Sequence, residues 1–465
     1  MDKITETVAD FVLSTDYDSL SPEVIAVIVR HHLDGVGCAA GAFDSEPARI
    51  VRSVAQGVTG PLNASVYGLS DRVLVDSATF ANSSMNRYLD FNDTIPAHPN
   101  DMVPALFSIA EATGASGEDL ILSIYIGYEV QAAFFKGSPG LRIRGWDQGS
   151  FLGLGAVAGV SKLLGLTKEE IGNAISLTVI PNIPLRVVRT GVMTHWKGCA
   201  TAYAARSAVF AAQLAQNGLQ GPGRPFDGVD GFFSQVSGTA FDVEPGVPVD
   251  GLSAIERSAF KYYPSEFNSQ VPLGIVLELR KEIDVDDIET LSVATHHVGW
   301  HEIGGGQGDV AEKWDPRTRE TADHSLPYVL AVALTDGKIA IESFEMERVL
   351  DPKLRPLMDK ISVVEDKEMS RQRDEGLWAA EVTIQMKDGR VIKKREDQPK
   401  GVIENPMSDE ELLEKFDAMV PRVLGPAEHA LLRERLLGLA QVKDLEEIAS
   451  LFRQFTIRAK ESAGA

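Results

Sequence analysis

The sequence predicts a mainly α-helical protein with a smaller α+β domain. As far as about residue 245, apolar and small residues recur at three- and four-residue spacings, which is the period of a helix with a buried face. Beyond a Gly- and Pro-rich stretch at 220–250, residues 250–400 contain alternating or β-branched runs typical of strands. With 465 residues the chain exceeds what one hydrophobic core usually serves, so we expect two large domains.

The first half of the chain is expected to form a compact helical bundle. Helix starts are marked by Ser21 before Pro22 and by Thr167 before Glu170, and ends by Gly114 and Gly218. Frequent Ala and Gly residues permit close approach of neighbouring helices. The expected helices cover residues 21–41, 79–91, 102–114, 117–135, 151–166, 168–180 and 199–218.

The second half is expected to begin with strands and to end with helices. Strands are predicted at 290–298, 360–366 and 379–396, the last folded back at a KDGR turn. Amphipathic helices follow at 408–420 and 429–442. If these helices return to pack on the first bundle, the α+β domain is an insertion. We expect residues 460–465 to fray.

Composition excludes several classes of partner. The formal net charge of −22 repels phosphate backbones and anionic lipid, so we expect no nucleic acid and no membrane partner. The most apolar stretch, 151–166, is interrupted by Lys162 and is too short to span a bilayer. Cys38 and Cys199 are too few for a disulfide scaffold, which favours a reducing cytoplasm.

The segment from Tyr88 to Asp101 holds the strongest candidate site. Pro96 and Pro99 flank His98 and deny it a regular helix, so the histidine is expected on a loop with a restrained backbone, as a general acid or base is usually presented. The alternative is a capped turn with His98 as a surface residue. The polar side chains gathered here between apolar runs are Asp90, Asp93, Thr94, His98 and Asp101.

Three other segments place polar groups beside apolar elements. His195 and Lys197 come just before a helix of small residues, where a helix N-terminus and a lysine would suit a carboxylate, although Lys197 is equally compatible with a solvated surface lysine. The segments 258–270 and 319–334 are expected to reach a cleft between the domains. They contribute Lys261, Tyr262, Tyr263, Asn268, His324 and Tyr328.

Neither a metal nor a cofactor is expected. His296, His297 and His301 lack the helical HExxH spacing and matched acidic ligands of a zinc site. The GGGQG run at 304–308 lacks the strand-before, helix-after context of a nucleotide loop, and the sequence contains no GxxxxGK[ST] motif.

Several blocks together resemble the MmgE/PrpD family, which includes 2-methylcitrate dehydratase, cis-aconitate decarboxylase and an iminodisuccinate epimerase. The resemblance covers most of the chain, and the blocks occur in the family's order. They are LDFNDT with HPND, GWDQGSFLGLGAVAGVSKLLGL, MTHWKGCATAYAARSAVFAA, FKYYPSEFNSQ and TADHSLPYVLAVAL.

The resemblance implies a fold, an assembly and a site. It implies a helical domain built from both chain ends, residues 1–247 and 405–465, an inserted α+β lid domain at 248–404, and a homodimer. The active site would lie between the domains. By block matching, the residues that line it are Asp90, Thr94, His98 as the acid/base, Lys197, Lys261 and Tyr328.

Two positions depart from the family pattern. Asp147 stands where decarboxylase-like members have a histidine, and Asn268 where dehydratase-like members have another. Both are placed at substrate-binding positions, and both remove an ionisable imidazole. We expect Asp147 to repel a substrate carboxylate, which argues against simple cis-aconitate decarboxylation.

We therefore expect the protein to be a cofactor-independent lyase that acts on a small di- or tricarboxylate, most simply a 2-methylcitrate dehydratase-like hydro-lyase. His98 would transfer the proton, Asp90 and Thr94 would orient it, Lys197 and Lys261 would bind carboxylates, and Tyr328 would donate to the leaving oxygen. The alternatives are an epimerase or isomerase of a dicarboxylate, a cis-aconitate decarboxylase-like activity, and a catalytically silent binding protein.

Overall fold

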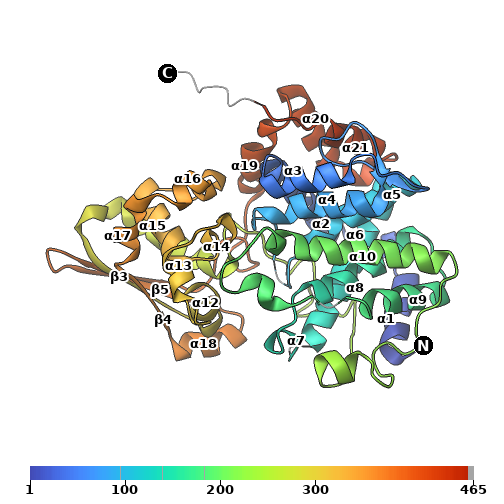
Figure 1. The fold of residues 1–465 in the computed structure, drawn as a ribbon, viewed down its shortest axis with the longest axis horizontal. Helices are drawn as coiled ribbons and strands as arrows, with labels where there is room; N and C mark the ends of the chain where they lie inside the picture. Colours follow the sequence, from blue (N-terminus) through green and yellow to red (C-terminus); the bar gives the residue numbers. More distant parts are fainter. Residues whose placement is uncertain (95, 139, 183, 459–465) are drawn as a thin grey trace.

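Two large hydrophobic cores organise the computed structural model, which describes residues 1–458 except 95, 139 and 183. One core contains buried side chains from Ile4 to Phe260 and again from Met407 to Phe455, and the other runs from Val271 to Met386. Figure 1 shows the helical domain beside a smaller domain that carries the sheet. The predicted fold class, mainly α with an inserted α+β domain, is confirmed.

The helical domain contains ten helices from the first half of the described chain and three from its end. The N-terminal helices are α1 Lys3–Ser14, α2 Pro22–Ala42, α3 Glu46–Ala55, α4 Val75–Tyr88, α5 Val103–Thr113, α6 Gly117–Gly137, α7 Gly140–Ile143, α8 Gly149–Leu163, α9 Lys168–Val179 and α10 Trp196–Gln216. The C-terminal helices are α19 Asp409–Met419, α20 Pro426–Leu437 and α21 Glu446–Arg453. A short antiparallel pair of two-residue strands, β1 Asn63–Ala64 and β2 Val73–Leu74, lies before α4.

Local sequence signals explain where these helices begin and how closely they pack. Ser21 accepts a hydrogen bond from the Val24 amide, and Thr167 forms a capping box with Glu170, as predicted. α6 and α8 approach so closely that a Cβ added to Gly155 would lie 2.5 Å from the Gly127 carbonyl oxygen. Glycine is therefore required at this crossing.

The lid domain carries a four-stranded mixed sheet of order β4-β3-β5-β6. Its strands are β3 Ile288–Thr295, β4 Ile361–Glu365, β5 Ala380–Met386 and β6 Val391–Glu396, with β3 parallel to β4 and antiparallel to β5. Its helices are α11 Gln270–Leu279, α12 His297–Ile303, α13 Val310–Trp314, α14 Arg319–Ala322, α15 Leu326–Asp336, α16 Met346–Val349, α17 Arg355–Met358 and α18 Lys367–Asp374.

The structure differs from the sequence expectation at two element ends that border the site. The helix expected at 79–91 stops at Tyr88, because Asp90 has a φ of 52° and cannot continue a right-handed helix. The strand expected at 290–298 ends at Thr295, because His296 caps α12 by accepting a hydrogen bond from the Gly299 amide.

The domain boundaries expected at 248 and 404 remain proposals. Ile255 and Phe260, which that division assigns to the lid, pack in the core of the helical domain. Val271 is the first residue in the core of the lid. The segment between Phe260 and Val271 therefore joins the two cores, and residues 460–465, expected to fray, lie outside the described residues.

Among the described helices, α2 alone is long and apolar enough to cross a membrane, and 72% of that apolar window is buried inside the protein. Cys38, on α2, and Cys199, on α10, are both buried free thiols.

Lys415 ties the C-terminal helices to the rest of the fold. From α19 its Nζ lies 2.7 Å from Asp34 Oδ1 on α2 and donates to the carbonyl oxygens of Phe91 at 2.7 Å and Lys261 at 2.9 Å. These two carbonyls belong to the segments that carry the site. A lysine from the end of the chain thus positions residues near 91 and 261.

We predict that Lys415→Met lowers the free energy of unfolding by about 3 to 5 kcal/mol, because it leaves the buried Asp34 carboxylate without its cation. Urea unfolding followed by circular dichroism measures the change. The matched control is Lys443→Met, which removes an exposed pair with Glu118 and should cost at most about 1 kcal/mol. Equal losses in the two variants would contradict this role of Lys415.

Candidate active site

His98 lies on the loop after α4 with both ring nitrogens engaged. Nδ1 lies 2.6 Å from the Asp93 carbonyl oxygen and Nε2 lies 3.3 Å from Arg87 Nη2. A carbonyl only accepts and a guanidinium only donates, so the proton resides on Nδ1 and Nε2 presents a lone pair. Burial lowers the pKa of His98 well below its usual value, and the nearby Arg87 and Lys261 lower it further. The ring is therefore neutral.

The backbone of this loop is strained and clamped. Asp90, Ala97 and His98 have φ values of 52°, 61° and 54°, in the left-handed region that costs a non-glycine residue about 1 to 3 kcal/mol. Gln131 on α6 donates to the carbonyl oxygens of Pro96 and Ala97 at 2.7 and 3.1 Å. Such strain gathered in one loop is typical of a functional site.

Asp93 is the residue that holds the histidine loop in place. Its carbonyl orients the ring of His98, and its carboxylate accepts from the Tyr128 hydroxyl at 2.8 Å and from the Asn100 amide at 3.0 Å. His31 on α2 lies 3.2 Å from the same carboxylate. The sequence predicted that Asp90 and Thr94 orient His98, but the closest contact comes from Asp93.

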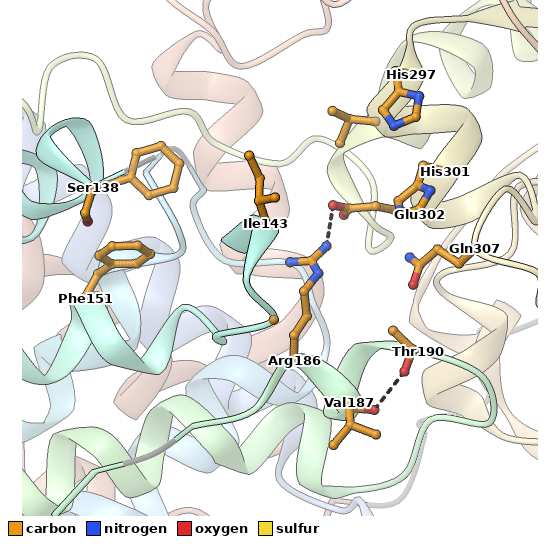
Figure 2. Close-up of a pocket in the computed structure, with 13 residues that line it drawn as sticks. Ser138, Ile143, Phe151, Arg186, Val187, Thr190, His297, His301, Glu302 and Gln307 are labelled. Carbon is orange, nitrogen blue, oxygen red and sulfur yellow. Dashed lines mark hydrogen bonds and ion pairs between the residues drawn. The ribbon is translucent and has the colours of Figure 1, made fainter. Parts of the chain in front are cut away.

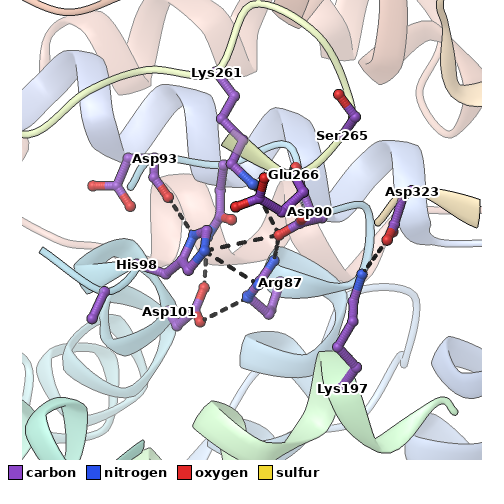
Figure 3. Close-up of polar contacts among 12 residues, drawn as sticks. Arg87, Asp90, Asp93, His98, Asp101, Lys197, Lys261, Ser265, Glu266 and Asp323 are labelled. Carbon is purple, nitrogen blue, oxygen red and sulfur yellow. Dashed lines mark hydrogen bonds and ion pairs between the residues drawn. The ribbon is translucent and has the colours of Figure 1, made fainter. Parts of the chain in front are cut away.

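A buried charged group faces Nε2 of His98. Asp90 is paired with Arg87 and, at 2.9 Å, with Lys261, whose Nζ also donates to the Asp90 carbonyl oxygen at 2.9 Å. Burial alone would raise the pKa of Asp90, but Arg87 and Lys261 outweigh burial and hold it well below its usual range. Asp90 Oδ1 lies 3.9 Å from His98 Nε2 (Figure 3).

A second ion-pair group lies beside the first and joins the two domains. Lys197, in the first turn of α10, lies 2.5 Å from Asp323 of the lid, and Arg319 on α14 lies 3.0 Å from the same carboxylate. His324 Nδ1 lies 2.6 Å from Asp323 and 3.8 Å from Asp90, which links the two groups. Lys197 and Lys261 are almost completely buried, and burial lowers the pKa of each although the carboxylates oppose it.

The two positions that depart from the family pattern are both paired. Asp147 lies 2.6 Å from Arg189 Nε, and Arg189 holds the pKa of this buried carboxyl below its usual value against the effect of burial. The repulsion of a substrate carboxylate expected from Asp147 is therefore offset by a guanidinium. Asn268 donates from its backbone and its side-chain amide to the two carboxylate oxygens of Glu266, each at 2.7 Å.

Two predicted residues take other positions. Tyr328 lies in the core of the lid, where its hydroxyl donates to the Ser343 carbonyl oxygen at 2.6 Å, and the structure does not bring it to His98. Thr94 contributes through its backbone, which forms a two-way bridge with Ala259 at 2.8 and 2.9 Å. This bridge sets the loop of His98 beside the segment that carries Lys261.

Sequence reasoning overlooked four charged residues of the site. Arg87 precedes Asp90 by three residues at the end of a helix, a spacing that signals an ion pair. Arg319, Asp323 and Glu266 stood inside recognised motifs but gave no separate signal. The roles of Asp323 and Arg319 follow from contacts across more than 100 positions of the chain, of Asp323 with Lys197 and of Arg319 with the Tyr88 carbonyl.

Asp90, Asp323 and His324 are close enough together to hold a metal ion, with candidate ligand atoms within 4.8 Å of one another. The chemistry around them fits a divalent cation poorly. Arg87 and Lys261 are already paired with Asp90, and Lys197 and Arg319 with Asp323. Four cations surrounding two carboxylates suit an anionic ligand better.

Two clefts lie between the domains. One, of about 720 Å³, is bounded by Phe135, Ile143 and Arg186 on the helical domain and by His297, His301 and Glu302 on the lid (Figure 2). Arg186 and Glu302, which both line it, form an ion pair of 2.5 Å. The other, of about 830 Å³, is lined by Tyr88, His195 and Arg319 among others.

The fold and the site define a class: two-domain proteins that hold a neutral histidine and several buried cations between a helical domain and an inserted α+β domain. This chain belongs to the MmgE/PrpD family. The family's N-terminal domain matches residues 6–244 and its C-terminal domain residues 263–439. The second match includes α19 and α20, which pack on the helical domain.

Named relatives share about a quarter of their residues with this chain over most of its length. It is 27% identical to cis-aconitate decarboxylase of Homo sapiens over 90% of this chain and 88% of the relative. It is 26% identical to the mitochondrial 2-methylcitrate dehydratase of Yarrowia lipolytica over 84% and 78%. It is 26% identical to 2-methylcitrate dehydratase of Escherichia coli strain K12 over 77% of each chain.

We predict that His98 stays neutral with its proton on Nδ1 between about pH 6 and pH 8, because burial, Arg87 and Lys261 all oppose its charging. Nitrogen-15 NMR of the imidazole, assigned with the His98→Gln variant, distinguishes the two tautomers and the charged ring. A His98 signal that titrates within this range, or that carries its proton on Nε2, would contradict the assignment.

Proposed function

We propose that this protein is a cofactor-independent lyase that eliminates water from a small hydroxy di- or tricarboxylate, with 2-methylcitrate as the first candidate. The observation that carries the proposal is the neutral His98, whose Nε2 lone pair faces Arg87 among buried cations. A base beside cations can remove a proton next to a carboxylate while the cations stabilise the charge that develops. Relatives named 2-methylcitrate dehydratase support the choice of substrate.

In the proposed mechanism, substrate carboxylates bind to Lys261 and Lys197, which are held 2.9 and 2.5 Å from Asp90 and Asp323. A carboxylate would share these cations with the two aspartates. His98 Nε2 takes the proton from the carbon next to a substrate carboxylate, and the Asp93 carbonyl stabilises the resulting imidazolium through Nδ1. Arg87 lies where it can contact the enolate-like intermediate.

Decarboxylation of cis-aconitate is the second candidate. The sequence argument against it was the negative charge of Asp147, and Arg189 lies 2.6 Å from that carboxylate. The relative from Homo sapiens carries this name. Epimerisation of a dicarboxylate would use the same proton abstraction by His98 without loss of water or carbon dioxide.

We predict that the purified protein converts 2-methylcitrate to its unsaturated product and that His98→Gln slows this at least about 10²-fold, because the base is removed. Ultraviolet absorbance of the new double bond follows the reaction, with citrate and cis-aconitate as parallel substrates. The matched control is His429→Gln on α20, which lies in a pair with Asp417 outside the site and should keep full activity.

The result separates the candidates. Release of carbon dioxide from cis-aconitate, without dehydration of 2-methylcitrate or citrate, would indicate a decarboxylase and not a dehydratase. Solvent deuterium entering an otherwise unchanged dicarboxylate would indicate the epimerase. If none of these acids is converted, the proposed enzymatic activity is contradicted, and a catalytically silent binding protein is the remaining alternative.

We also propose that the protein is a homodimer that associates through one face of α10. Trp196, Tyr203 and Phe210 repeat every seven residues along this helix and are 45%, 46% and 54% exposed. Aromatic side chains aligned on one exposed helix face are typical of an interface. Cytoplasmic location, expected from the cysteine content, stays a prediction.

We predict that combining Tyr203→Glu with Phe210→Glu converts the dimer to a monomer, because the charges would be buried on association. Light scattering after size-exclusion chromatography gives the mass. The control is Val229→Glu on a separate loop, where an apolar side chain is 98% exposed, and it should not change the mass. A monomeric wild-type protein would contradict the proposal.

A further inference from the structure

Glu266 occupies the junction between the buried charged group and the lid. Its backbone amide donates to the Asp323 carbonyl oxygen at 2.9 Å, so its position is tied to the ion pair of Lys197. Its carboxylate accepts from the backbone and side-chain amides of Asn268, each at 2.7 Å. Figure 3 shows the carboxyl group beside Lys261 and Asp90.

The charges that face Glu266 come from both domains. Asp90 and Lys261 lie on its helical-domain side, and Glu302, which lines the interdomain cleft, lies on the lid side. Lys313 on α13 is a further buried cation that interacts with it. Burial raises the pKa of Glu266 to about 7, with Glu302 adding to the effect and Lys261 opposing it. This carboxyl can therefore hold a proton near neutral pH while Asp90 and Asp323 remain ionised.

Asp101 is another carboxyl of the site whose pKa is raised, to about 6, again by burial. It lies beside Arg87: Asn92 donates to one of its oxygens at 2.6 Å, and Arg87 Nε lies 3.3 Å from the other. Asp101 is fully buried, whereas Glu266 retains 9% exposure. Glu266 is therefore the more accessible of these two carboxyls and the better placed proton donor for a ligand.

We propose that Glu266 is the acid that protonates the departing hydroxyl, an inference that rests on the proposed dehydration. His98 Nε2 takes the proton from carbon, and the C–H electron pair becomes the second bond of the new double bond. The C–O bond breaks with its electron pair on oxygen, and the proton of Glu266 completes a water molecule. The imidazolium of His98 then returns its proton to the Glu266 carboxylate through water as product leaves.

The sequence analysis gave the role of proton donor to the leaving oxygen to Tyr328, and we assign it to Glu266 instead. The hydroxyl of Tyr328 is occupied by the Ser343 carbonyl inside the lid. Asn268, which the sequence resemblance places where dehydratase-like members are expected to have a histidine, donates to both oxygens of Glu266. Its two donors fix the direction of the carboxyl group without supplying a competing proton.

The test compares two leaving groups. With the hydroxy acid, Glu266→Gln should lower kcat by about 10²- to 10⁴-fold, because the oxygen must leave without a proton. With the analogue that carries fluorine in place of this hydroxyl, the same variant should keep its rate within a few-fold, since fluoride leaves unprotonated. His98→Gln should slow both substrates, because each still requires removal of the proton from carbon.

A pH profile provides a second readout. An acid must be protonated to act, so kcat/KM for the hydroxy acid should fall above about pH 7 in the wild type, and this fall should disappear in Glu266→Gln and persist in Glu266→Asp. The matched control is Glu129→Gln, a buried carboxyl on α6 whose pKa is also raised to about 7 and which lies outside the site. Its profile should match the wild type.

The outcomes are distinct. Equal slowing of the hydroxy and fluoro substrates by Glu266→Gln, or an unchanged fall above about pH 7 in that variant, would overturn the role of Glu266 while the dehydratase stands. If the wild type acts on neither acid, the proposed function itself fails. A lowered melting temperature would reveal that Glu266→Gln has lost its folded state. Glu266→Asp serves as the check, because it keeps the carboxyl group and should recover activity on the hydroxy acid.

Discussion

The rest of the site depends on the pairing of Asp90 with Arg87 and Lys261 in the protein interior. Taking these charges out of water is costly, and only close pairing and hydrogen bonding compensate for it. To reach both partners, the chain must leave α4 at Tyr88 and place Asp90 in a left-handed conformation. The loop that begins at this turn carries His98, which has a left-handed conformation of its own, so the ion pair and the histidine depend on the backbone of one loop.

Charge arrangement then assigns each group its protonation state. Burial, Arg87 and Lys261 keep His98 neutral, and the same two cations keep Asp90 ionised. Lys197 and Arg319 keep Asp323 ionised. Glu266, turned toward Glu302 as well as toward Lys261, holds its proton most readily at neutral pH. Groups of opposite proton affinity thus lie within one buried cluster, as an elimination that needs both a base and an acid requires.

Chain topology explains how the cluster is assembled. Lys415 from the C-terminal helices anchors the carbonyls of Phe91 and Lys261, and the Thr94–Ala259 bridge aligns the same two segments. Arg319 reaches from the lid to the carbonyls of Tyr88 and Leu89 at the end of α4. Inserting the lid between the two halves of the helical domain brings these distant segments to one place.

The sequence by itself determined the helical periodicity, the change of texture beyond residue 250 and the family, and through the family it predicted His98, Lys197 and Lys261 as site residues. These features are local, since spacing, caps and motifs lie within a few positions of one another. Only the tertiary structure decided which charged partners join the site, namely Arg87, Asp323 and Glu266. It also decided that Asp147 pairs with Arg189 and that Tyr328 lies in the lid core. The reason is physical. The pKa of a buried group depends on the charges that folding brings close to it, and the spacing of those residues along the chain does not determine the distances between them.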